Sequence, residues 1–112
     1  MNLPNEFTIS WGRELIAHLG GDPTPIRDNW CWKQFGEQYP ELRPRVEKFI
    51  EDSTEGDIAW AAYWMCMSCG SSREWAEAQI ERGIGGVTTA AQSMCMFCGS
   101  SREWAEKQRM KK

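Results

Sequence analysis

The sequence predicts an all-α protein, a small helical bundle of about six to seven helices that ends in a duplicated helix-turn-helix repeat. Two observations support this fold class. A stretch of 19 residues recurs with a period of 29, and its apolar residues follow helical spacing. No segment alternates apolar and polar residues in the way that a half-buried strand does. At 112 residues the chain is long enough to bury one core.

The repeat occupies residues 61–79, AAYWMCMSCGSSREWAEAQ, and residues 90–108, AAQSMCMFCGSSREWAEKQ, which are identical at fifteen of nineteen positions. In each copy a glycine follows the first apolar stretch, where a helix C-cap favours a residue that can adopt a positive φ. The sequence Ser-x-x-Glu comes next and is typical of a capping box that begins at the first serine. Each copy is therefore predicted to be a helical hairpin, with units at about residues 58–82 and 87–110.

Three further helices are predicted before the repeats. Residues 10–19 have apolar residues at helical spacing, residues 24–38 begin with Thr-Pro, which is typical of a helix start, and residues 41–52 have one apolar side. Ser53 or Thr54 is expected to cap the next helix. The chain is thus divided into residues 1–53, a three-helix segment that packs on the repeats, and residues 54–112, the tandem helical-hairpin repeat.

The two copies differ on one face of the first helix of the hairpin. Trp60, Tyr63 and Trp64 are replaced in the second copy by Thr, Gln and Ser. The three positions are three and four residues apart, so they share one side of a helix. Either residues 1–53 cover this aromatic face and the second hairpin is a polar end cap, or the three aromatic residues form an exposed patch that binds a partner protein.

Four cysteines lie in two CxxCG sequences, at Cys66, Cys69, Cys95 and Cys98. This pattern resembles the zinc knuckles of zinc-ribbon and treble-clef proteins, and the resemblance implies a tetrahedral site in which four thiolates bind one Zn²⁺. The flanks here are helical, unlike the short strands of those proteins. The second pair also arose with the duplication, and the thiols converge only if the hairpins face each other about a pseudo-two-fold axis.

Two other interpretations of the cysteines stay open. They are soft core residues that pack beside methionines, or they form a redox pair or a Cu(I) site. A thioredoxin-like role is disfavoured, because both CxxC sequences end helices, where the helix dipole does not lower a thiol pKa. Cys31, between two tryptophans, is predicted to be an inert buried thiol.

The composition points away from several function classes. The net charge of −3 disfavours a nucleic-acid partner, and the longest apolar run is too short to cross a membrane. The start of the chain has no signal-peptide pattern, so we expect a cytoplasmic protein with reduced thiols. His18 is the one histidine, and no catalytic motif accompanies it. We therefore do not expect an enzyme, and a homo-oligomer stays open.

The Glu-Trp-Ala-Glu sequences, with their serine lead-in, resemble short Trp-Ala helical repeats of phage and bacterial proteins across residues 58–108. The resemblance implies a helical array and a mobile-element origin. Together with seven Trp residues, it favours a non-enzymatic protein-interaction module, such as a phage-type inhibitor or adaptor of the anti-defence type that acts on a larger host protein. The alternatives are a zinc-stabilised binding module and a thiol redox protein.

Overall fold

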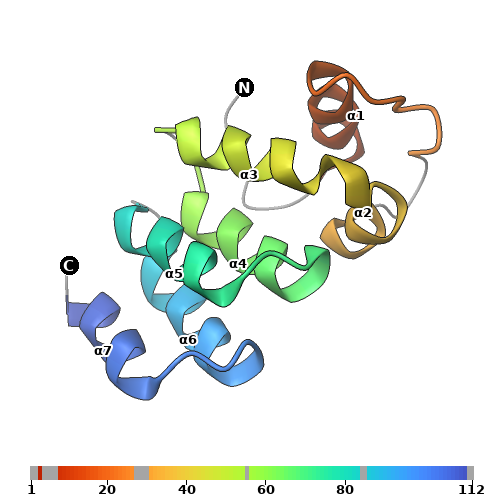
Figure 1. The fold of residues 1–112 in the computed structure, drawn as a ribbon. Coiled ribbons are helices and arrows are strands. Elements are labelled where there is room, and N and C mark those ends of the chain that lie inside the picture. The colour runs from red at the N-terminus through yellow and green to blue at the C-terminus, as the bar shows by residue number, and fades with distance from the viewer. Residues whose placement is uncertain (1–2, 4–7, 27–30, 55, 84–85, 111–112) are drawn as a thin grey trace.

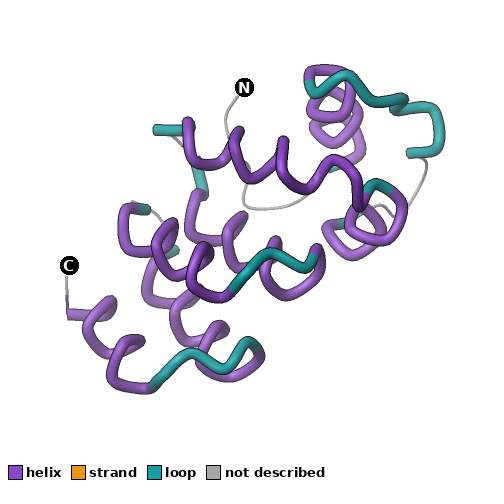
Figure 2. The backbone as a smooth tube through the Cα atoms, viewed as in Figure 1, coloured by secondary structure: helices purple, strands orange, loops and turns teal. Residues whose placement is uncertain are grey.

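The computed structural model describes residues 3, 8–26, 31–54, 56–83 and 86–110. Within these ranges the chain forms seven α-helices, one short 3-10 helix and no strand, so the predicted all-α fold is confirmed (Figure 1, Figure 2). An isolated bridge joins Leu3 to Gly56. The helices are α1 (Ile9–His18), α2 (Trp32–Gln38), η1 (Pro40–Leu42), α3 (Arg43–Asp52), α4 (Ile58–Cys69), α5 (Arg73–Arg82), α6 (Val87–Phe97) and α7 (Arg102–Met110).

The helices form an elongated array with principal extents of 42, 24 and 22 Å. Figure 1 shows α1 at one end and α7 at the other, with the hairpin of α4 and α5 between α3 and the hairpin of α6 and α7. Helix α4 contacts α2, α3, α5 and α6, so it is the central element of the array. This position explains why its sequence is apolar on nearly every side.

The turn inside each hairpin forms as predicted, with one shift in register. Gly70 has a φ of 82° and Gly99 a φ of 80°, the left-handed conformation that a residue with a side chain rarely adopts. The prediction of the first serine as the N-cap is wrong, because Ser72 accepts the backbone N–H of Trp75 at 3.1 Å and the second copy has the equivalent bond. The first serine instead bonds to the preceding hairpin.

A third, divergent copy of the unit lies upstream of the two that the sequence reveals. Arg43 on α3 donates a hydrogen bond from Nη1 to the Gly70 carbonyl at 2.9 Å, and Arg73 on α5 donates the same bond to the Gly99 carbonyl at 3.0 Å. From 43 to 73 is 30 residues, close to the period of 29. Helices α2, η1 and α3 therefore form the first unit, α4 and α5 the second, and α6 and α7 the third.

Two further contacts repeat between successive units. Ser71 Oγ donates to Glu47 on α3 at 2.6 Å, and Ser100 Oγ donates to Glu77 on α5 at 2.6 Å. The tryptophan after each turn donates its indole N–H to a second glutamate on the same helix, at 3.2 Å in the first interface and 3.4 Å in the second. All these contacts run from a turn to the second helix of the preceding unit. The units therefore stack in one direction rather than about a two-fold axis.

Two clusters of buried apolar side chains lie on either side of α4. The first joins α1, α2 and α3 to Ile58, Ala61 and Met65. The second joins the other side of α4 to α5, α6 and the start of α7, with Ile80 and Met94 fully buried. Helix α4 therefore carries packing from both directions, and the site described below lies beyond the second cluster.

The predicted helix over residues 24–38 begins too early. Thr24 forms a turn, because its backbone N–H and its hydroxyl both bond to the Asp22 carboxylate, at 3.0 and 2.6 Å. Helix α2 begins at Trp32, and residues 27–30 of the predicted helix lie outside the described residues.

The predicted cap of α4 at Ser53 or Thr54 is also wrong. Ser53 Oγ donates back to the carbonyl of Phe49 at 2.8 Å, at the end of α3. The N-cap residue is instead Asp57, whose N–H bonds to the carbonyl of Leu3 at 3.0 Å, and α4 begins at the next residue.

The first two units pack closely at Gly36 on α2, and a substitution there tests this contact. A methyl group added there would overlap the Ser68 carbonyl oxygen and lie 3.0 Å from Cys69 Cα. We predict that Gly36→Ala lowers the free energy of unfolding by about 1–3 kcal/mol through this overlap, although alanine ordinarily favours a helix by about 1 kcal/mol. Urea unfolding measures the change, with Lys33→Ala on the exposed side of α2 as the control. A Gly36→Ala variant as stable as the parent would contradict the close packing.

Candidate functional site

The third unit has an open groove between α6 and α7. It has a volume of about 390 Å³. Figure 1 places these two helices at the end of the array farthest from α1. The groove is lined by Gln92, Cys95, Met96, Arg102, Ala105, Glu106 and Arg109.

The equivalent surface of the second unit, 29 positions earlier, is covered. There Tyr63, Ala76 and Ile80 are buried in one cluster with Ala90 and Met94 of α6. Helix α6 lies against both α4 and α5, as α4 lies against α2 and α3. The groove of the third unit is thus the surface that, in the interior of the array, holds the next hairpin.

The groove keeps part of this surface and changes the rest. Arg102, Ala105 and Glu106 are unchanged from the second unit, whereas two buried apolar positions hold exposed polar residues, Gln92 and Arg109. Among the described residues no side-chain hydrogen bond or ion pair engages Arg102 or Glu106. Their counterparts in the first and second units are engaged by the following turn. The end of the array therefore presents docking groups that lack the turn they hold elsewhere.

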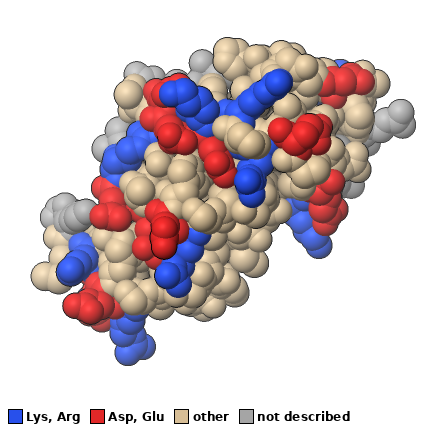
Figure 3. Space-filling model, in the orientation of Figure 1, with Lys and Arg blue, Asp and Glu red and all other residues tan. Residues whose placement is uncertain are grey.

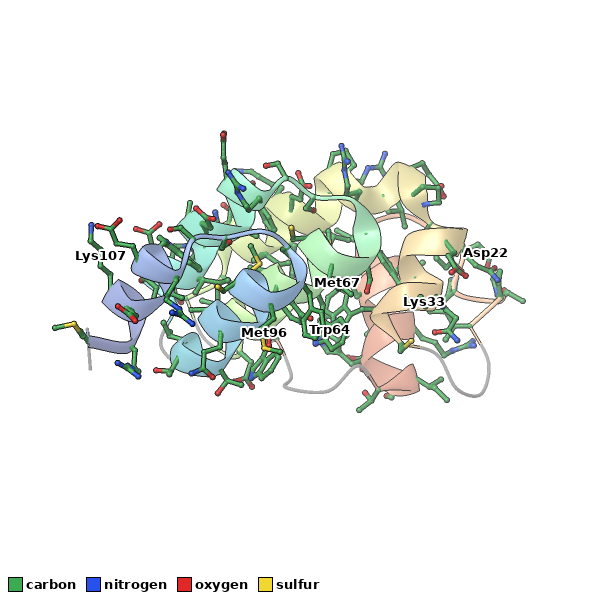
Figure 4. All side chains as sticks on the ribbon, turned by 90° about the horizontal axis from the view of Figure 1, so that it is seen from below. Asp22, Lys33, Trp64, Met67, Met96 and Lys107 are labelled. Carbon is green, nitrogen blue, oxygen red and sulfur yellow. The ribbon has the colours of Figure 1, made fainter. Side chains whose placement is uncertain are left out.

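Exposed apolar side chains lie near this end. Met96 is 74% exposed, Phe97 beside it is 58% exposed, and Met67, the counterpart of Met96 on α4, is 46% exposed. Figure 4 shows the two methionines on neighbouring helices, and Trp64 one turn before Met67 on α4. Met96 and Phe97 on α6 form an exposed apolar surface that is typical of a contact region for another protein, whereas Met67 lies on α4, outside the groove.

The predicted aromatic patch lies at the junction of the second and third units. Tyr63 is buried, and its ring centroid is 5.9 Å from that of Trp60 and 5.0 Å from that of Trp64. Trp60 is half-buried against Gly86, where an added Cβ would lie 2.6 Å from the indole. Trp64 is half-buried between the two apolar clusters. The three side chains are therefore brought together, but they are only partly exposed, and partner binding by them stays a prediction.

The structure places one cysteine of each CxxC sequence beside the other. The Cys98 thiol lies against that of Cys66, across the interface of the second and third units. Burial, followed by the neighbouring Cys98, raises the pKa of Cys66 to about 12. Burial of the Tyr63 side chain, followed by the neighbouring Cys98 and Cys66, raises the pKa of the Tyr63 hydroxyl.

The other two cysteines of the predicted zinc site lie apart from this pair. Cys69 donates from Sγ to the carbonyl of Trp32 at 3.4 Å, and burial, followed by the neighbouring Cys31, raises its pKa to about 12. Cys95 lines the open groove. Among the described residues no three His, Cys, Asp or Glu side chains are placed to hold one metal ion.

A four-cysteine zinc site therefore does not fit this arrangement, because the stacking in one direction brings two thiols together rather than four. A Cys₄ centre would need the hairpins to pack differently. Zinc binding stays a prediction, which metal analysis of the protein purified without added zinc tests.

Cys31 is exposed, and its prediction as a buried thiol is wrong. It is the N-cap residue of α2, and its thiol donates to the side-chain oxygen of Gln34. The neighbouring Trp32 is buried in the core, whereas Cys31, just before the helix, faces solvent. Adjacent tryptophans are therefore a poor indicator of burial at a helix start.

A second groove, of about 610 Å³, lies between α1 and α3 and includes His18. Its charged groups are engaged: Arg45 donates to the carbonyl of Leu19 at 2.6 Å, and Lys48 pairs with Asp52 at 3.2 Å. Among the described residues, the groove between α6 and α7 thus differs from this second groove because its charged side chains Arg102 and Glu106 have no partner.

No family model, curated protein or solved structure matches this chain. None of the described helices is long and apolar enough to span a bilayer.

The raised pKa values make a prediction about thiol reactivity. Because the thiolate is the nucleophile, Cys66 and Cys69, with pKa values of about 12, should react slowly at neutral pH and faster as the pH rises. We predict that iodoacetamide labels the exposed Cys31 first, as followed by mass spectrometry of digests taken over time. Unfolded protein, in which these differences should disappear, is the control. Equal labelling of Cys31 and Cys66 in folded protein at neutral pH would contradict the prediction.

Proposed function

We propose that this chain is a non-catalytic protein-interaction module that binds a larger partner protein through the open groove between α6 and α7. One observation carries the proposal: the groove retains Arg102, Ala105 and Glu106, whose counterparts hold the next hairpin in the second unit, and no described residue fills it. An adaptor or inhibitor acts by binding, so a docking surface on rigid helices is the feature that it needs.

The residues of the groove suit a partner that binds reversibly. Met96 supplies exposed apolar area, and Arg102, Glu106 and Arg109 supply charges of both signs around it. Methionine and arginine are enriched at protein interfaces, and methionine adapts its shape to different partners. In the second unit, which is permanently covered, the positions of Gln92 and Arg109 hold the buried Tyr63 and Ile80 instead.

The charge distribution supports a protein partner rather than a nucleic acid. The net charge is −3. Figure 3 shows acidic and basic side chains interspersed over the face in view, without an extended basic stripe. Phosphate binding depends on a concentration of Lys and Arg, which releases counterions from the nucleic acid.

The resemblance to Trp-Ala repeats supports a phage or mobile-element origin. We propose a phage or mobile-element protein that acts in the cytoplasm and inhibits or recruits a larger host protein. The half-buried Trp60 and Trp64 are a second candidate contact region. The neighbouring thiols of Cys66 and Cys98 support a second candidate function, a thiol redox protein, which the labelling experiment above separates from the first.

Two equivalent methionines provide a test of the groove. We predict that Met96→Glu abolishes capture of the partner in quantitative affinity purification from the source organism or its host, because it places a charge on the exposed apolar part of the groove. Met67→Glu is the matched control, since Met67 has the same position in the second unit and does not line the groove. Thermal unfolding of both variants verifies that they fold.

Three outcomes would count against the proposal. Capture of the same protein by Met96→Glu as strongly as by the parent would place the site elsewhere. Equal loss with Met67→Glu would show that the groove has no special role. If the parent protein captured no protein that a tag-only control does not also capture, the proposed interaction would be contradicted.

A further inference from the structure

We infer that the groove between α6 and α7 recognises the end of a helix in the partner, namely a helix that stops at a left-handed glycine followed by a serine. The glycine carbonyl accepts from Arg102, and the serine hydroxyl donates to Glu106. This inference rests on the proposed function and specifies the chemistry of the partner segment.

The two interior interfaces supply the template for this contact. Arg43 and Arg73 each donate to a glycine carbonyl, at 2.9 and 3.0 Å. Glu47 and Glu77 each accept from the serine that follows, in both cases at 2.6 Å. The same pair of groups thus binds the same turn twice within one chain, although α3 and α5 differ at six of ten aligned positions.

Arg102 and Glu106 have the spacing that this contact needs. They are four residues apart on α7, as Arg73 and Glu77 are on α5, where the pair lies 3.5 Å apart. Residues at i and i+4 lie on the same side of a helix, so the two groups face one site. An arginine and a glutamate side by side need an acceptor and a donor, respectively. A phosphate or carboxylate would be repelled by Glu106, whereas an uncharged glycine-serine turn satisfies both groups.

The turn itself has a defined shape. The N–H of Ser71 bonds to the carbonyl of Met65 at 3.1 Å, and that of Ser100 bonds to the carbonyl of Met94 at 3.2 Å. These are the bonds of a Schellman motif, which needs a positive φ at the glycine. In both interior turns this shape presents the glycine carbonyl and the serine hydroxyl to the same facing helix. A partner turn without glycine would not place the two groups together.

The floor of the groove sets a further requirement on the partner helix. Ala105 repeats Ala76, which is fully buried beneath α6. Small residues of α6, Ala90 and Ala91, belong to the same buried cluster and allow the close approach. The partner helix therefore needs small residues near its middle and polar or acidic residues where it would face Arg109.

A second folded copy of this chain cannot supply the turn. Its two glycine-serine turns are already engaged, the first by Arg43 and Glu47 and the second by Arg73 and Glu77. Opening either one would break an interior interface of the array. A segment of another protein is the occupant that we propose, and self-association is an outcome that the test below would reveal.

The probe for the test is an acetylated peptide that copies residues 86–101, with both cysteines replaced by alanine. It is titrated to millimolar concentration into the isotope-labelled full chain, and binding is followed by NMR chemical shifts, because an isolated helix of this length is marginal and binds weakly. We expect saturable shifts at Met96, Arg102 and Glu106. Peptide variants with Ser100→Ala or Gly99→Ala should bind about tenfold more weakly. The first loses the hydroxyl that donates to Glu106, and the second disfavours the positive φ that orients the carbonyl toward Arg102.

A matched pair of protein variants completes the test. Glu106→Ala should weaken binding of the parent peptide about tenfold and leave the Ser100→Ala peptide unchanged, because both substitutions remove the same bond. Glu103→Ala, an exposed change on the same helix outside the groove, should have no effect. Equal binding of the Ser100→Ala and parent peptides, shifts confined to another surface, or concentration-dependent self-association at the groove would overturn the inference. If the Met96→Glu variant still loses the captured partner, the proposed function stands while this recognition mode fails.

Discussion

The hydrogen bond from an arginine of one hairpin to the glycine carbonyl of the next sets the geometry of the array. Burial of apolar side chains supplies most of the driving force, but it is not directional and would allow neighbouring hairpins to slide. A hydrogen bond to a charged donor contributes about 1.5–3 kcal/mol when buried. Arg73 is 52% exposed, so solvent reduces this contribution well below that range. The bond is therefore more important for the register of the hairpins than for stability.

This register determines where the cysteines lie. Because each turn docks on the preceding unit, the turn of the third unit brings Cys98 to Cys66 on α4, and the turn of the second unit brings Cys69 to the start of α2. A two-fold arrangement of the same hairpins would bring both pairs to one place. Spacing along the sequence is the same in the two cases. The zinc hypothesis therefore depends on a symmetric arrangement of the hairpins, which the spacing of the cysteines does not specify.

The sequence predicts the second and third units well, because their turns keep the glycine and the serines that define a helix end and a helix start. It does not reveal the first unit. There the residues Pro40–Leu42 form a 3-10 helix in place of the glycine turn, and the positions that persist, such as Arg43 and Glu47, are charged surface residues. The open groove is equally hidden. Gln92 is visible as a polar replacement, but its meaning depends on knowing which side of α6 receives the next hairpin.

The outer residues of the third unit indicate whether its groove resembles a cap or a binding surface. A cap replaces the docking residues by polar ones throughout, because nothing will cover them. Here two apolar positions of the second unit become polar, yet Arg102 and Glu106 are retained, and Ser68 of the second unit is replaced by an exposed Phe97. An exposed phenylalanine of this kind is unusual in a polar cap and typical of a contact surface. This mixture of retained docking residues, polar replacements and exposed apolar area is the composition that the proposed function requires, because a surface that a partner covers reversibly must also be stable in water.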